Sequence, residues 1–138
     1  MTLSLTRRAA FALAMAMAAL PLLSLMAAHA AEPTQMTPAQ VQDLQAAGQP
    51  LLVVFRADWC STCAAQERAI NAILADDPTL GEAVTIALID WDEYGNDPFT
   101  TGLNIPRRST LVRFNGNVEI GRLVAQTSRA QIEALLRS

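Results

Sequence analysis

The sequence contains no lysine, and its single histidine, His29, lies close to the N-terminus. Aromatic residues make up only 5% of the 138 residues. Beyond residue 29 the chain therefore lacks the usual general base at neutral pH and the usual nitrogen ligand of zinc. Any chemistry in that part must come from cysteine, carboxylate, hydroxyl or arginine side chains.

The first thirty residues have the composition of an export signal. Arg7 and Arg8 precede an uncharged run over residues 9–28 that is rich in alanine, leucine and methionine, and Ala28-His29-Ala30 follows it. A basic start, an apolar stretch and a small-x-small site are typical of a secretory signal peptide. We predict cleavage after Ala30 and a periplasmic or otherwise extracytoplasmic location.

Two alternatives stay open for this segment. A stretch of about 20 apolar residues is long enough to span a bilayer as an uncleaved anchor, in which case the protein would also be a membrane protein. The adjacent pair Arg7-Arg8 is compatible with twin-arginine export as well as with the general route.

Residues 31–138 are predicted to form the one mature domain. Without Arg7 and Arg8, eight of the ten basic residues remain against thirteen acidic ones, which gives a formal net charge of −5. An acidic domain of this kind has no electrostatic basis for binding nucleic acid.

Hydrophobic patterns and turn signals predict an α/β domain with a mixed central sheet of four or five strands and helices on both faces. Two capping boxes, Thr37 with Gln40 and Ser128 with Gln131, predict helix starts, and Asn115-Gly116-Asn117 predicts a hairpin. The expected helices cover residues 38–47, 60–76, a short stretch after 98, and 129–136. The expected strands cover residues 51–55, 84–89, 110–114 and 118–124, with a possible brief edge strand in 31–36, and residues 91–104 are otherwise expected to be polar and turn-rich.

Both cysteines lie where a buried strand is followed by a helix, as Cys60 and Cys63. A disulfide across two residues closes almost no loop and contributes little to stability, so a redox role is favoured over a structural one. A cysteine in the first helical turn faces unpaired amide hydrogens and the positive end of the helix dipole, which favour the thiolate. We expect Cys60 to be the more exposed cysteine and Cys63 to lie close enough to attack a mixed disulfide.

The run Asp58-Trp59-Cys60-Ser61-Thr62-Cys63 after this strand resembles the active-site motif of the thioredoxin family, and the resemblance extends over residues 34–137. The Ala-Asp-Trp-Cys part is especially similar to the C-terminal domains of periplasmic thiol:disulfide interchange reductases. The resemblance implies a thioredoxin-like fold and an oxidoreductase without a cofactor or metal. It also implies that Cys60 attacks, that Cys63 resolves and that Trp59 flanks the site. The partners it implies are protein thiols or disulfides and an unidentified redox partner.

The gapless match also marks departures from the family. Ser109 stands where the family usually has a cis-proline, and Arg108, Ser109 and Thr110 are expected to line the site opposite Cys60. Val54 stands where many thioredoxins have a buried aspartate, and Ile86 where a lysine often accompanies it.

The missing aspartate removes the expected proton acceptor of Cys63, and water, Asp58 or Glu67 remain as alternatives. The direction of electron flow stays open, because the Ser61-Thr62 centre matches neither typical reductants nor strong periplasmic oxidants. A binding module that holds a metal or a partner protein through the cysteine pair, and a redox-inactive interaction domain, are the other functions that the sequence allows.

Overall fold

A five-stranded sheet in the order β1-β3-β2-β4-β5 forms the centre of the computed structural model, which describes residues 32–138. The predicted export signal and its cleavage point lie outside the described residues. The strands are β1 (Thr34–Gln35), β2 (Pro50–Arg56), β3 (Thr85–Asp90), β4 (Thr110–Asn115) and β5 (Val118–Val124). β3 runs parallel to β1 and β2, whereas β4 is antiparallel to both β2 and β5. The mixed sheet and the brief edge strand predicted from the sequence are confirmed.

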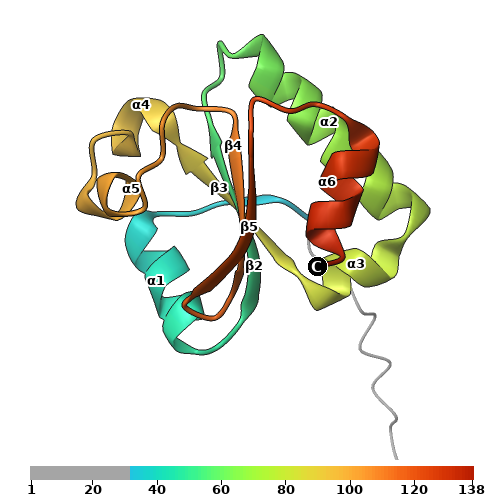
Figure 1. Ribbon diagram of the computed structural model, residues 1–138, viewed down its shortest axis with the longest axis horizontal. Helices are drawn as coiled ribbons and strands as arrows, with labels where there is room; N and C mark the ends of the chain where they lie inside the picture. The colour runs from blue at the N-terminus through green and yellow to red at the C-terminus, as the bar shows by residue number, and fades with distance from the viewer. Residues whose placement is uncertain (1–31) are drawn as a thin grey trace, which may run out of the picture.

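Helices cover both faces of this sheet, as predicted. α1 (Pro38–Ala46), α4 (Trp91–Tyr94) and α5 (Pro98–Gly102) lie on one side, and α2 (Ser61–Asp76), α3 (Pro78–Ala83) and α6 (Arg129–Leu136) lie on the other (Figure 1). None of the helices within residues 32–138 has the length and hydrophobicity needed to cross a bilayer.

The central strand β2 is buried on both faces, and its alternating side chains supply two separate cores. Leu52 and Val54 pack with the α2, α3 and α6 side, while Leu51, Val53 and Phe55 pack with the α1 and α5 side. All five side chains are fully buried. The continuous apolar run in the sequence reflects this double burial.

Of the two predicted capping boxes, one is present in the structure and the other is not. The Thr37–Gln40 capping box is present, with both reciprocal hydrogen bonds. The Ser128–Gln131 capping box is absent: Ser128 is the N-cap residue of α6, but its side chain makes no capping hydrogen bond. Burial of Ile132 in the core against α2 holds α6 in place, because tertiary packing stabilises a short helix more than its cap does.

Two short helices, α3 and α4, were not predicted. Each follows an aspartate cap: the Asp77 carboxylate accepts from the Thr79 amide at 3.2 Å, and the Asp90 carboxylate accepts from the Asp92 amide at 2.9 Å. The helix expected after Pro98 is confirmed as α5. Short capped turns of this kind resemble polar loops in sequence, because they carry no apolar periodicity.

The topology brings two distant segments to one corner of the sheet. β2 ends at Arg56 and leads into α2, while antiparallel β4 begins at Thr110 beside Phe55. The chain just before β4 must therefore lie next to the start of α2. Every residue predicted for the site lies at this corner.

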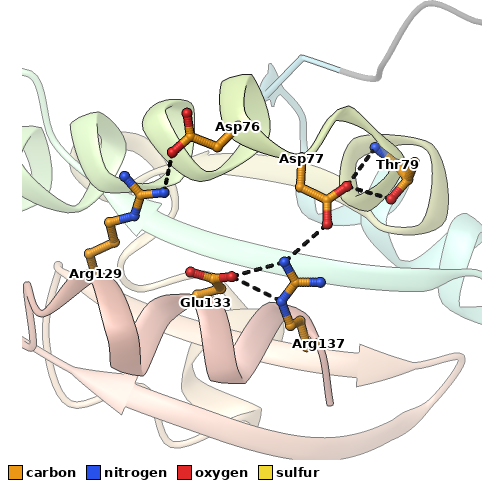
Figure 2. Close-up of polar contacts among 6 residues, drawn as sticks. All are labelled: Asp76, Asp77, Thr79, Arg129, Glu133 and Arg137. Atoms are coloured by element: carbon orange, nitrogen blue, oxygen red, sulfur yellow. Dashed lines mark hydrogen bonds and ion pairs between the residues drawn. The ribbon is translucent and has the colours of Figure 1, made fainter.

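On the face of the sheet that α2, α3 and α6 cover, ion pairs join α6 to the junction between α2 and α3 (Figure 2). Arg137 binds Asp77 at 3.0 Å and Glu133 at 2.8 Å, and Arg129 binds Asp76. Hydrogen bonds from Thr79 and then from Arg137 lower the pKa of Asp77 below its usual value.

Replacing Asp77 by asparagine tests this pairing, since the amide keeps an oxygen for the cap but loses the charge. Because the carboxyl pKa is lower in the folded than in the unfolded chain, the ionised form stabilises the fold above about pH 4, and that contribution is lost on acidification. We expect Asp77→Asn to lower the thermal midpoint at about pH 7 and to match the native protein near pH 2. Glu82→Gln, in the helix α3 that Asp77 caps and outside any ion pair within residues 32–138, is the control. A pH-independent difference would contradict the pairing.

Candidate active site

Cys60 and Cys63 lie at the N-terminus of α2, with Cys60 as its N-cap residue and Cys63 inside its first turn. A disulfide joins them, and their Cα atoms are 5.2 Å apart. Cys60 is 5% exposed and Cys63 is fully buried. The predicted order of exposure is confirmed, although both sulfurs are more enclosed than the sequence suggested.

The helix terminus favours negative charge on Cys60. The Cys63 amide donates a hydrogen bond to the Cys60 sulfur at 3.1 Å, so the side chain occupies the position of a helix cap. The 16-residue helix α2 also directs the positive end of its dipole at this sulfur. Both interactions are stronger for a thiolate than for a thiol, so the site favours the reactive form of Cys60.

Ser109 faces the two sulfurs from the opposite side of the corner. Its hydroxyl oxygen lies 3.1 Å from the Cys60 sulfur and 3.1 Å from the Cys63 sulfur. The residue is fully buried and adopts φ +62°. No peptide bond within residues 32–138 is cis, so the bond that precedes Ser109 is trans.

Gln66 belongs to the same polar cluster and is not predicted by the sequence pattern. It is fully buried, and its side-chain amide donates to the carbonyl oxygens of Ser109 at 3.1 Å and Gln126 at 2.9 Å. Its spacing of three residues from Cys63 could have revealed it, because positions i and i+3 share one face of a helix.

Trp59 lies beside Cys60 at the surface and is 60% exposed. Its indole N–H donates to the Asp92 carboxylate at 2.8 Å, and the Arg108 guanidinium lies 4.0 Å above the ring centre. Stacking of a cation on the ring holds both side chains next to the cysteine. Thr110, the remaining residue expected to line the site, is buried and donates its hydroxyl proton to the Arg107 carbonyl at 2.8 Å.

The acidic side chains nearest to this corner are turned toward an arginine. Arg56 binds Asp58 at 2.5 Å and Glu67 at 2.6 Å. Burial lowers the pKa of Arg56, but the hydrogen bonds to Asp58 and Glu67 outweigh burial and raise it above its ordinary value. The guanidinium therefore stays charged and offsets the negative charge of Asp58 beside the cysteine pair.

The core on which α2 packs is apolar at the two positions where the sequence departs from the family pattern of aspartate and lysine. Val54 and Ile86 are fully buried and pack in one hydrophobic cluster with residues of α2 and α6. Neither can accept a proton from Cys63. Within residues 32–138, no group of three or more histidine, cysteine or acidic side chains is arranged to hold a metal ion.

Residues 32–89 match the protein family described as Thioredoxin-like. The chain is similar in structure to Trxlp from Edwardsiella tarda EIB202, at 24% identity and a TM-score of 0.64, over 75% of this chain and 98% of that one. It is also similar to thioredoxin from Trypanosoma brucei brucei, at 18% identity and a TM-score of 0.65, over 81% and 94%. A third similar chain, at 16% identity and a TM-score of 0.62 over 76% and 93%, comes from a structure of the thiol-resolving mechanism of yeast mitochondrial 1-Cys peroxiredoxin via glutathione/thioredoxin systems. No curated protein sequence matches the chain.

The fold and the site define a class of protein: a thioredoxin fold in which a Cys-X-X-Cys pair opens the helix after the central strand. The chain has the thioredoxin fold, and residues 32–89 carry the sequence pattern of the Thioredoxin-like family. With Cys60 and Cys63 at that helix terminus, it is a thiol–disulfide oxidoreductase.

The polar cluster behind the cysteines predicts a cost for removing Gln66. Gln66→Met keeps the length of the side chain but deprives two carbonyl oxygens of a donor, and we expect a loss of about 1–3 kcal/mol in the free energy of unfolding by urea. Gln45→Met is the control, because Gln45 is also buried but makes no side-chain hydrogen bond within residues 32–138. Equal losses in the two variants would show that the hydrogen bonds of Gln66 contribute nothing.

Proposed function

We propose that this protein is exported and exchanges disulfides with protein substrates, with Cys60 as the attacking cysteine and Cys63 as the resolving one. The position of Cys60 at the N-terminus of α2 carries the proposal, because it favours the thiolate that exchange requires. Cys63, one helical turn away and already within bonding distance of Cys60, supplies the second thiol.

In the reductive direction the Cys60 thiolate attacks one sulfur of a substrate disulfide. The substrate S–S bond breaks, a mixed disulfide forms at Cys60, and the other substrate sulfur leaves as a thiolate. Cys63 then loses its proton and attacks Cys60, which releases the second substrate sulfur and restores the Cys60–Cys63 disulfide. The oxidative direction runs through the same intermediate in reverse.

The shape of the surface favours a protein substrate over a small molecule. Two surface hollows, one lined in part by Glu67 and Asn71 and the other in part by Gln40 and Asp43, do not include Cys60. Beside that sulfur the surface presents the exposed ring of Trp59, held in place by Arg108 and Asp92. A fixed aromatic surface next to a nearly buried sulfur suits a substrate that docks over a broad area.

The export part of the proposal rests on the N-terminal sequence. Arg7 and Arg8, the apolar run over residues 9–28 and the small residues before Ala31 have the order of a signal peptide. A cysteine pair that cycles between dithiol and disulfide suits a compartment in which protein disulfides form.

Two cysteine variants test the assignment of roles. We expect Cys63→Ser to accumulate a mixed disulfide with a disulfide-bonded protein substrate, because the resolving thiol is missing. We expect Cys60→Ser to form no such adduct and to exchange no faster than the uncatalysed reaction. Non-reducing electrophoresis and mass spectrometry of the adduct, together with an insulin reduction assay, provide the measurement.

The reverse pattern, with the adduct on Cys63, would contradict the assignment of roles. The reduction potential and the metal content of the same sample distinguish exchange from metal holding. Exchange predicts a reversible two-electron couple between roughly −120 and −270 mV. Stoichiometric metal in place of this couple would overturn the proposal.

Export predicts a defined N-terminus. In a Gram-negative host we expect the full-length gene product to be recovered from the periplasm with Ala31 as its first residue, as shown by intact mass. Replacement of both Arg7 and Arg8 by lysine keeps the charge, so it blocks only twin-arginine export and identifies the route. Recovery of the intact chain from the membrane fraction would contradict cleavage.

A further inference from the structure

The hydroxyl of Ser109 is the one side-chain group within residues 32–138 that hydrogen-bonds to the sulfur atoms of the cysteine pair. Its oxygen is equidistant from both, at 3.1 Å, and the residue is fully buried. Water therefore does not compete for this hydroxyl from an exposed face, and its orientation is decided by the two sulfurs.

The backbone holds this hydroxyl in place at a conformational cost. The Ser109 amide donates to the Phe55 carbonyl at 2.7 Å, and the Ser109 carbonyl accepts from the Gln66 side chain and from the Ala125 amide at 2.8 Å. These bonds maintain φ +62°, a left-handed backbone conformation that is unfavourable for a residue other than glycine. Strained residues of this kind concentrate at functional sites, where the surrounding structure enforces them.

The hydroxyl interacts differently with the two redox states. A hydroxyl has one hydrogen to donate and two lone pairs to accept with. Disulfide sulfurs carry no hydrogen and are weak acceptors, so the oxidised pair uses little of this capacity. Reduction produces a Cys60 thiolate, which is a strong acceptor, and a Cys63 thiol, which is a donor.

We propose that Ser109 is a catalytic residue whose hydroxyl forms two hydrogen bonds with the reduced pair. It donates its hydrogen to the Cys60 thiolate and accepts the hydrogen of the Cys63 thiol. The proposal rests on the disulfide exchange argued above. When a substrate dithiol is oxidised, it gives two electrons and two protons. The Cys60–Cys63 bond breaks, one proton stays on Cys63, the other enters solvent, and Cys60 remains a thiolate that Ser109 stabilises.

Few side chains at this site can interact with the sulfurs through hydrogen bonds. The buried amide of Gln66 is bonded to the carbonyl oxygens of Ser109 and Gln126, and the side chain of Val54, in the core packed against α2, can neither donate nor accept. The charged groups at the corner have other partners: Arg56, from the end of β2, binds both Asp58 and Glu67.

The remaining charged groups come from α4 and from the segment before β4. Asp92 and Arg108 both contact Trp59, and the Arg107 guanidinium bonds the Arg108 carbonyl. None of these groups forms a hydrogen bond with either sulfur, so removal of the hydroxyl leaves the thiolate with the amide of Cys63 alone.

Three substitutions of Ser109 separate the hydroxyl from the backbone strain. Ser109→Ala removes the hydroxyl and keeps the strain, Ser109→Gly removes both, and Ser109→Thr keeps the hydroxyl. The measurements are the pH dependence of Cys60 alkylation by iodoacetamide and the redox equilibrium with glutathione, each made on the purified protein. Thr100→Val is the matched control, because Thr100 is a fully buried hydroxyl on α5 that makes no hydrogen bond.

We expect the alanine and glycine variants to shift in the same direction and by similar amounts. The midpoint of the pH dependence of Cys60 alkylation rises by about one pH unit, which is a tenfold smaller acid dissociation constant of its thiol. The redox equilibrium moves about tenfold toward the disulfide, which makes the reduction potential about 30 mV more negative. Ser109→Thr and Thr100→Val stay close to the native values.

Unchanged alkylation and redox equilibrium in both Ser109→Ala and Ser109→Gly would overturn the proposal. A shift in only one of the two variants would also overturn it, because the hydroxyl is missing from both. Should the alanine variant fail to fold, the glycine variant, which φ +62° accommodates, still tests the hydroxyl, because unchanged alkylation and redox equilibrium in that variant would overturn the proposal. These measurements need no protein substrate. They can therefore be interpreted even if the proposals on protein substrates and on export prove wrong.

Discussion

The hydrogen bond from the Ser109 amide to the Phe55 carbonyl, 2.7 Å long, is the contact on which the arrangement of the site depends. It lies where antiparallel β4 begins beside the end of β2, one step beyond the regular pairing of Phe55 with Thr110. Because β2 leads directly into α2, this bond brings the serine hydroxyl against the sulfurs of both cysteines. A slip of one residue in this register would turn the Ser109 side chain to the other face of the sheet.

At the cysteine pair, the helix terminus strongly favours negative charge on Cys60, and few polar side chains lie nearby. The helix terminus supplies amide hydrogens and a dipole, and both act on Cys60 without the help of a charged side chain. The core on which α2 packs is made of aliphatic side chains such as Val54 and Ile86. The Ser109 hydroxyl is the side-chain group that contacts both sulfurs within residues 32–138, and Gln66 supports this residue through a hydrogen bond to its carbonyl oxygen.

The outer rim of the site is built differently, from paired charges and an aromatic ring. Arg108 and Asp92 hold Trp59 from two sides, and Arg56 holds the carboxylates of Asp58 and Glu67. The exposed pair of Arg56 with Asp58 contributes little to stability, typically less than about 1 kcal/mol. The effect of these contacts is to fix the shape and the charge of the surface that a substrate meets beside Cys60.

The sequence alone determined the class of fold, the order of the main strands and helices, and the place of the cysteine pair, because these follow from local patterns: apolar runs, the Thr37 cap and the two-residue spacing of the cysteines. Tertiary structure decided the rest. The short helices α3 and α4 lack periodicity, and the Ser128 cap is replaced by packing of Ile132 in the core. Ser109 contacts the sulfurs of Cys60 and Cys63 from more than 40 residues away in the sequence, and only the pairing of β2 with β4 brings these segments together.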